Sequence, residues 1–301
     1  MEQRFKSLYL FEFRKWFSTK ENCISYLAEL NWVNGFRCNK CGHGNSCKGV
    51  PPASWHCTSC NYREYPTSNT LFHLVRFDIV KYFYIVYFAA TKKRGITSTE
   101  LSRKLDLRQK KCWAFKGKVM KVMKSLGDRY IDFTIEVDLT VLGGQEEREQ
   151  KALSSWYIEK EEGRVEALCK SEIQCQYESL GNFMKHHIAA EAILTTNQWT
   201  GYRLLAKVFE NLIPVPSGKT GIYFTELYRT IINLKGWLRE IHHYVWDLQD
   251  YLEEHCYKFN LSIMKEGIFD SLMLRLVNTA PCFIKTSVTK RLRASNNNNL
   301  I

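Results

Sequence analysis

Two pairs of cysteines have the residue type and spacing of metal ligands. Two residues separate Cys38 from Cys41 and Cys57 from Cys60, and fifteen residues lie between the pairs. This spacing lets two tight turns aim four thiolates at one tetrahedral ion, and it is typical of structural zinc sites. Because four thiolates leave no open coordination position, we expect Zn²⁺ to stabilise a small module and not to activate water.

The residues around these cysteines predict a module made mostly of turns. Residues 32–66 are rich in Gly, Asn, Cys, Ser and Pro, which mark loops. Gly42 and Gly44 follow the first pair and can adopt the positive φ that tight turns often need. Four aromatic residues in this stretch can form a miniature core or stack on nucleic-acid bases, and we favour the core. They are Trp32, Phe36, Trp55 and Tyr62.

A second candidate site is the basic stretch from Thr91 to Arg129, which holds thirteen Lys or Arg and three acidic residues. Two helices are predicted in it, at Ser98–Leu105 and at about 109–125, with a short break between them. Such a pair is typical of a helix-turn-helix, whose second helix enters the major groove of DNA. A solvated surface helix is the alternative.

The second predicted helix has an apolar side and a lysine-rich side. The apolar side is expected to face inward, and it consists of Trp113, Val119, Met120 and Met123. The lysines are expected to face outward and to bind DNA phosphates, which gives affinity without sequence readout. These candidate DNA-binding residues are Lys110, Lys111, Lys116, Lys118 and Lys121.

The charge of the whole chain agrees with this interpretation. Residues 1–130 hold 24 Lys and Arg against 9 Asp and Glu, whereas residues 131–301 hold 19 against 22. A basic block joined to a mildly acidic one favours a nucleic-acid partner. The most apolar stretch, Tyr82–Ala90, is too short to span a membrane. Eleven cysteines, an odd number, without an export signal predict reduced thiols in a cytoplasm.

The elements that must position these residues change in type along the chain. Two short helices are predicted before residue 30, and an apolar helix from Asp78 to about Thr91. After Gly127 the pattern becomes alternating, which predicts strands. The expected order is three antiparallel strands, a helix, a further strand and flanking helices, and it is compatible with a ribonuclease-H-like mixed α/β sheet. These elements are Ile131–Asp138, Ser155–Glu159, Arg164–Cys169, Tyr177–His187, Ala189–Thr195, Leu227–His242 and Leu248–Asn260.

Several short strings along the chain occur together in one known family. They are residues 26–32 with 35–38, 95–98, 136–138 with 143–144, 196–202, 233–238, 242–243, and 251–254 ahead of 259–260. From about Phe11 to Asn260 the chain thereby resembles bacterial insertion-sequence transposases of the Asp-Asp-Glu/Asn type that carry a zinc ribbon. The resemblance implies a ribonuclease-H-like catalytic domain, double-stranded DNA at element ends as partner, a homo-oligomer on DNA, and a cytoplasmic, nucleoid-associated location.

The resemblance also implies a catalytic site for cutting and joining DNA strands. In this family three residues from distant segments converge, and here they fall on Asp138, Asn197 and Asn233, with 58 and 35 residues between them. Clustered oxygen ligands of this kind hold two Mg²⁺, one to activate the nucleophile and one to stabilise the leaving oxygen. Lys235 matches a family lysine that meets phosphate, and the pair His242 and His243 matches residues near the DNA.

The sequence departs from the family pattern at Asn197, where an active member has Asp. Asp138 is then the one anionic Mg²⁺ ligand of the three, so strand cleavage is expected to be weak or absent. Replacement of the missing carboxylate by another acid, Glu136, Glu191 or Glu226, is left open. The alternative functions are a non-catalytic DNA-binding protein derived from a transposase and a zinc-ribbon interaction protein without a DNA role.

Five parts are expected along the chain. They are N-terminal helices (1–30), a zinc ribbon (31–70), a helix-turn-helix region (71–129), a ribonuclease-H-like transposase domain (130–264) and a C-terminal tail (265–301).

Overall fold

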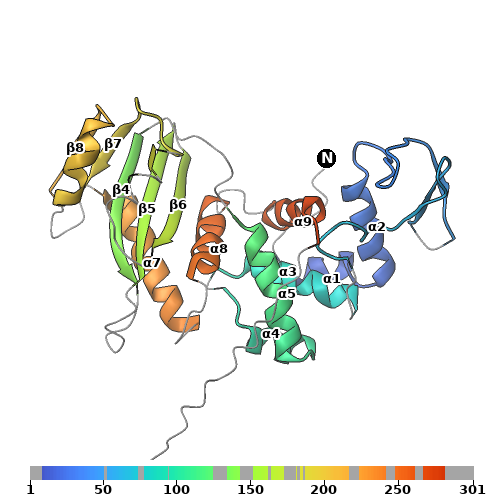
Figure 1. Cartoon of the computed structure of the whole chain (residues 1–301). Coiled ribbons are helices and arrows are strands. Elements are labelled where there is room, and N and C mark those ends of the chain that lie inside the picture. Colours follow the sequence, from blue (N-terminus) through green and yellow to red (C-terminus); the bar gives the residue numbers. More distant parts are fainter. Residues whose placement is uncertain are drawn as a thin grey trace, which may run out of the picture.

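The computed structural model is a mixed α/β protein in which a cysteine-bearing ribbon, a group of helices and a five-stranded sheet follow one another in space (Figure 1). The helices lie between the ribbon and the sheet. The structure describes residues 9–50, 53–73, 78–93, 95–124, 134–142, 152–161, 164–172, 181, 184–185, 187–216, 224–241, 248–261 and 267–281.

The helical part has one apolar core to which helices from both ends of the chain contribute. Aromatic residues dominate its centre: Phe13, Phe83 and Phe269 are each fully buried and come from three different helices. Threonine and aspartate caps start three of the helices, since Thr19, Asp78 and Thr97 each accept a hydrogen bond from the first turn. The helices are α1 (Leu10–Trp16), α2 (Lys20–Asn31), α3 (Ile79–Thr91), α4 (Ser98–Leu105), α5 (Gln109–Val122) and α9 (Ile268–Asn278).

Helix α9 lies within the segment that was expected to be a C-terminal tail, residues 265–301. That expectation is wrong for Ile268–Asn278, because Phe269, Leu272 and Leu276 are buried in the helical core. The Tyr26 hydroxyl of α2 donates a hydrogen bond to Asp270 of α9, which joins the two ends of the chain. The N-terminal helices are likewise part of this core and not a separate unit.

The five-stranded sheet has the order β6-β5-β4-β7-β8. β4 pairs antiparallel with β5, and β5 with β6, whereas β4 with β7 and β7 with β8 are parallel. The three predicted antiparallel strands and the further strand are confirmed, although their first and last residues differ from the expected ones. The strands are β4 (Thr134–Leu142), β5 (Ala152–Glu161), β6 (Arg164–Glu172), β7 (Ile193–Thr196) and β8 (Leu212–Pro214).

Each face of this sheet is covered by a different set of residues. Ile135 and Val137 of β4 pack with Met184, Ile188 and the 3-10 helix η1 (Thr200–Lys207) on one face. The opposite face packs against α7 (Thr225–Ile241) and α8 (Leu248–Asn260), which are expected helices that the structure confirms. Because side chains alternate along a strand, Glu136 and Asp138 of β4 share this second face.

Helix α8 covers the edge strand β6 and ties it down with side-chain amides. Asn260 accepts a hydrogen bond from the Ala167 backbone N–H at 2.7 Å and donates to the Ala167 carbonyl at 3.1 Å. Gln249, near the other end of α8, donates to the Cys169 carbonyl at 3.1 Å. These bonds satisfy backbone groups that an edge strand would otherwise expose.

A buried ionic cluster joins the helical part to the sheet through α5 and α8. Glu254 of α8 is fully buried, with its Oε1 2.6 Å from Lys258 Nζ and its Oε2 3.4 Å from Lys116 Nζ on α5. Burial acts to raise the pKa of Glu254, yet the two lysine charges outweigh burial and hold that pKa below its usual range. The expectation that Lys116 binds DNA is therefore wrong, because its side chain is 5% exposed and faces α8.

We predict that Glu254→Gln lowers the free energy of unfolding by about 3 to 5 kcal/mol, because two lysines would stay buried without a compensating charge. Urea unfolding at neutral pH measures the loss. Since the folded pKa of Glu254 lies below its unfolded value, the stabilisation is present above the usual carboxyl range and is lost as pH falls through the folded pKa.

Glu226→Gln is the matched control for this substitution. Glu226 pairs with Arg229 at 3.0 Å, but the two side chains are 33% and 62% exposed. We expect a loss below about 1 kcal/mol from an exposed pair. Equal losses from the two substitutions would contradict the structural role of the buried cluster.

Candidate functional site

The four predicted cysteine ligands converge on one point. Their Sγ atoms all lie within 4.8 Å of one another, and the pairs Cys38–Cys60 and Cys41–Cys57 are each 3.5 Å apart. Four sulfurs at 2.3 Å from a tetrahedral Zn²⁺ are about 3.8 Å apart, which is close to these separations. The residues therefore fit a metal ion such as zinc, and the donor set favours a soft metal.

Two turns of the same design present these cysteines. The carbonyl of Cys38 accepts from the Gly42 N–H at 2.8 Å, and that of Cys57 accepts from the Asn61 N–H at 3.0 Å. Gly42 and Asn61 both have positive φ, +74° and +54°. The sequence indicated the turn at Gly42 but missed Asn61, although asparagine is the side chain after glycine that best tolerates this conformation.

The surroundings of the cysteines act differently on the individual thiols and fix the first turn. The backbone N–H groups of Cys60 and Ser59 donate to the Cys57 sulfur and lower the pKa of that thiol to about 6. Burial and hydrogen bonds with neighbouring thiols instead raise the pKa of Cys41 to about 12 and also raise that of Cys60. Zinc binds the thiolate form. Glu64, which is buried on the short strand β3 (Arg63–Glu64), accepts from the Asn39 N–H at 2.8 Å and from its Nδ2 at 2.9 Å. The buried carboxylate thereby attaches β3 to the first cysteine turn.

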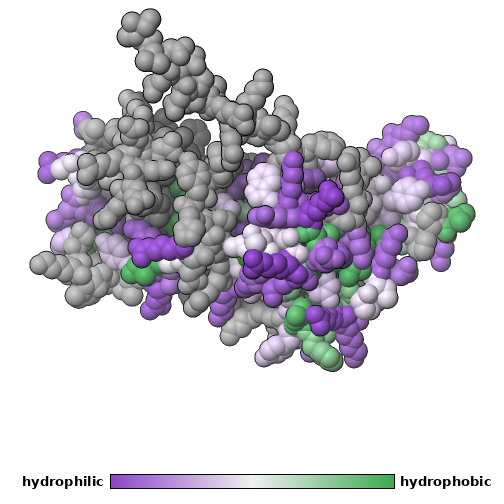
Figure 2. All heavy atoms as spheres, turned by 90° about the horizontal axis from the view of Figure 1, so that it is seen from below, coloured by the Kyte–Doolittle hydropathy of each residue, from purple (hydrophilic) through white to green (hydrophobic). Residues whose placement is uncertain are grey.

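Helix α5 turns most of its lysines to solvent. Lys110, Lys111 and Lys121 are exposed and Lys118 is half-buried, whereas the opposite side of the helix packs into the helical core. Trp113 is 48% exposed, so its expected inward orientation is wrong. In the space-filling view, hydrophilic side chains gather over the middle of the molecule, where Figure 1 places the helices (Figure 2).

The exposed side of α5 carries a stripe with a lysine at each end and small residues between them. Lys110, Ala114, Gly117 and Lys121 follow one another at intervals of three or four positions and therefore lie on one side of the helix. Alanine and glycine leave the helix backbone uncovered between the two ammonium groups.

Asp138, in the middle of β4, lies beside Asn197, which directly follows the end of the parallel strand β7. The pairing of Val137 with Thr196 places the next residue of each strand at the same level. Asn197 Nδ2 donates to Asp138 Oδ1 at 2.6 Å, and Asn197 Oδ1 accepts from the Trp199 N–H at 3.1 Å. Since a backbone N–H can only donate, the amide oxygen must face Trp199 and the amide nitrogen must face Asp138.

Tyr228 of α7 is within the electrostatic reach of Asp138, whereas Asn233 is on another side of that helix. Burial, followed by the negative charge of Asp138, raises the pKa of Tyr228 above its usual value. Asn233 is exposed, and its position five residues on is about 140° around the helix from Tyr228. The structure thus brings Asp138 and Asn197 together but does not bring Asn233 to them.

Lys235, which was expected to contact a DNA phosphate, is half-buried and lies two helical turns beyond Tyr228 on the same side of α7. His242 and His243 lie outside the described residues.

Of the three acids considered as replacements, Glu136 alone shares a sheet face with Asp138. It is 5% exposed and lies two residues earlier on β4. The β4–β7 register places Glu191 beyond the opposite end of β4, and Glu226 is paired with Arg229. Within the described residues, the four cysteines are the one group of three or more His, Cys, Asp or Glu side chains close enough to share a metal ion.

Comparison with known protein families finds no matching family model, and comparison with characterised proteins finds no significant match. In the part of the chain that the structure describes, no helix is both long and apolar enough to cross a membrane. The function must therefore be inferred from the geometry of the sites.

We predict one zinc ion per chain in a reduced preparation, and its loss in Cys38→Ser. The ribbon should then unfold while α1 and α2 remain folded, because these helices are part of the helical core. Structural zinc contributes on the order of 10 kcal/mol in zinc-finger peptides, so the ribbon cannot compensate for its loss. Elemental analysis measures the metal, and limited proteolysis locates the unfolded segment.

Cys47→Ser is the control for the zinc prediction. Cys47 is exposed and lies outside the four-cysteine group, with its Sγ 3.8 Å from the His56 carbonyl oxygen. This variant should keep its zinc. An unmodified, reduced chain that contains no zinc would contradict the assignment.

Proposed function

We propose that this chain is a DNA-binding protein built on the framework of a zinc-ribbon transposase, with a nuclease-like site that has lost the ability to hold two metal ions. The observation that carries the proposal is the lysine stripe on the exposed side of α5. Its ammonium groups can displace the counterions condensed on duplex DNA, and this displacement is the main source of non-specific affinity.

The arrangement of α4 and α5 supports a helix-turn-helix interpretation of this region. A link of three residues, 106–108, joins the two helices, and Asp106 has the left-handed conformation, with φ of +49°. Helix α3 packs against both of them through the helical core. In a helix-turn-helix the second helix enters the major groove, and α5 is the helix with the exposed lysines.

The sheet supports the ribonuclease-H-like interpretation of the second half. Its order, β6-β5-β4-β7-β8, has three antiparallel strands followed by strands parallel to β4, which is the order expected of such a sheet. Asp138 and Asn197 then lie where the resemblance expects the first two catalytic positions. The framework of a strand-transfer enzyme is therefore the best account of this half.

The contacts of Asp138 favour binding over cleavage. Two Mg²⁺ about 4 Å apart repel each other by on the order of 16 kcal/mol at an effective dielectric of about 20, which anionic ligands must offset. Here Asp138 has an amide donor as one neighbour and the Tyr228 phenol as another. The Asn197 amide N–H occupies one side of Asp138 Oδ1, where a cation would otherwise lie, but it brings no positive charge.

We predict that duplex DNA affinity falls steeply with salt and that α5 supplies part of this dependence. The slope of the logarithm of the binding constant against the logarithm of the salt concentration should decrease in magnitude by about 2 in the double variant Lys110→Ala, Lys121→Ala. Each phosphate that a lysine no longer neutralises contributes about 0.9 to this change. Fluorescence anisotropy with a labelled duplex over a range of salt concentrations measures the slope.

The control for charge alone is Lys185→Ala, Lys207→Ala, which removes two exposed lysines of the sheet half. It should leave the slope near that of the unmodified chain. If the affinity of the unmodified chain does not depend on salt, or if both double variants reduce the salt slope equally, then α5 is not the DNA-binding element.

We predict that Asn197→Asp combined with Tyr228→Glu creates a divalent metal site at Asp138, because it adds two carboxylates beside the existing one. Calorimetric titration with Mn²⁺ should show tighter binding than to the unmodified chain. The matched variant Asn197→Asp with Asn233→Asp should show less, since Asn233 is turned away from Asp138. If the variant with Asn233→Asp binds Mn²⁺ as tightly as the variant with Tyr228→Glu, then the placement of Tyr228, and not Asn233, near Asp138 is wrong.

A further inference from the structure

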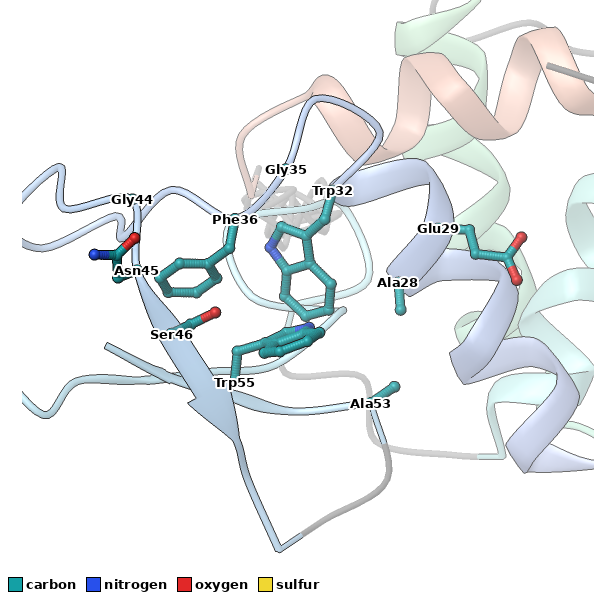
Figure 3. A pocket seen from close by; sticks show the side chains of 10 residues that line it. All are labelled: Ala28, Glu29, Trp32, Gly35, Phe36, Gly44, Asn45, Ser46, Ala53 and Trp55. Carbon is teal, nitrogen blue, oxygen red and sulfur yellow. The ribbon is translucent and has the colours of Figure 1, made fainter. Parts of the chain in front are cut away.

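A pocket of about 710 Å³ lies between the end of α2 and the zinc ribbon (Figure 3). Its volume is within the range of small-molecule sites, which are typically concave and lined by aromatic side chains. Trp32, Phe36 and Trp55 form its walls, and each of them is only half-buried. The expectation that these aromatic residues form a miniature core is therefore incomplete, because they also enclose a space open to solvent.

The backbone holds the three rings around this space. Gly35 has a φ of +86°, and its N–H donates to the Trp32 carbonyl at 3.0 Å, so the chain turns sharply after α2. This turn brings Phe36 and Trp32 next to Trp55. The centroids of Trp32 and Trp55 are 6.1 Å apart with nearly perpendicular rings, and Phe36 lies 6.4 Å from Trp55. Figure 3 shows the three side chains directed toward one another.

The polar groups at the pocket have the chemistry of nucleotide recognition. Asn45 and Ser46 line it with an amide and a hydroxyl group, which can bond to the edge of a heteroaromatic ring. Lys48 on β1 (Ser46–Lys48) lies directly across the ladder from Trp55 on β2 (Trp55–Cys57), so the two side chains share one face of this small sheet. Lys48 is not among the residues that line the pocket, but its side chain is exposed on the same face as Trp55, which leaves its ammonium available to an anion.

We propose that this pocket binds an unpaired nucleobase of a DNA strand, stacked on Trp55 and flanked by Trp32 and Phe36, with Lys48 near the adjoining phosphate. The proposal rests on the proposed DNA-binding function and assigns a ligand to the zinc ribbon. Bases within a duplex are already stacked on their neighbours, so the ligand must come from a single-stranded end or overhang. Aromatic platforms bind such bases with little dependence on sequence.

A methylated lysine is the other ligand that three aromatic rings could enclose, but the charges disfavour it. Aromatic cages for ammonium ions rely on the negative faces of the rings and gain from nearby acids. Glu29 is the acidic residue among those that line the pocket, and Figure 3 shows its side chain directed away from the rings. Lys48 would repel a cation and attract a phosphate.

The test compares three forms of one labelled duplex: blunt, with a short single-stranded overhang, and with the same overhang made of abasic sugars. The abasic overhang keeps the phosphates but lacks the bases. We expect the normal overhang to raise affinity about fivefold or more over the blunt duplex, and the abasic overhang to lose most of that gain. Binding of the normal overhang should also quench tryptophan fluorescence.

Two variants locate the effect in the pocket. Phe36→Leu keeps an apolar side chain but removes one ring, and it should bring the ratio of overhang to blunt affinity closer to one. Trp16→Leu removes an aromatic side chain that is 49% exposed and is not among the residues that line the pocket, so the ratio should be unchanged. Zinc content is measured in parallel to verify that the ribbon of each variant is folded.

This proposal would be overturned if the unmodified chain bound the overhang duplex no more tightly than the blunt duplex, or if the abasic overhang gave the same gain in affinity as the normal one. Duplex binding by α5 would not be affected by either result. A blunt duplex that does not bind, together with base-dependent binding of the free single strand, would overturn the proposed function and retain the pocket. Fluorescence quenching by a trimethyllysine peptide in place of the oligonucleotide would identify a cation site and overturn the base proposal.

Discussion

The relation between the helical part and the sheet depends on one buried carboxylate, Glu254. It holds Lys116 of α5 from one side and Lys258 of its own helix from the other, while α8 is attached to the edge strand through Asn260. A buried charge with both partners in place tolerates little rotation, because any displacement leaves an ammonium or a carboxylate unpaired away from water. The cluster thereby fixes the direction of α5, and with it the side on which the remaining lysines are exposed.

This arrangement explains which parts of the structure could be predicted from sequence. The cysteine spacing fixes its own ligand set, since both turns are local, and the alternating strands and capped helices are local as well. Lys116 could not be distinguished from Lys118, because its burial depends on an acid 138 positions away. The rotation of α7, which brings Tyr228 and not Asn233 to Asp138, is set by packing of the whole helix on the sheet. Helix α9 was missed because its apolar pattern lies close to a polar, low-complexity end of the sequence.

The contacts of Asp138 support the proposal that this site does not hold two metal ions. Asn197 remains at the end of β7, and its amide bonds both to Asp138 and to the Trp199 backbone. These two bonds satisfy the polar groups that a metal ion would otherwise hold in place. Under the proposed function, α5 and the cysteine ribbon would contact DNA through phosphates and aromatic rings and would not require metal ions at Asp138. The proposed DNA binding is therefore independent of any ability to cleave DNA.

We propose that the unmodified chain holds duplex DNA without cutting it, and a single-turnover cleavage assay distinguishes binding from cleavage. A supercoiled plasmid is incubated with excess protein in Mg²⁺ and separately in Mn²⁺, at a salt concentration where a mobility shift verifies that the DNA is bound. We expect a bound plasmid without nicks or linear product in either metal. Metal-dependent nicking by the unmodified chain that Asp138→Asn abolishes would contradict it.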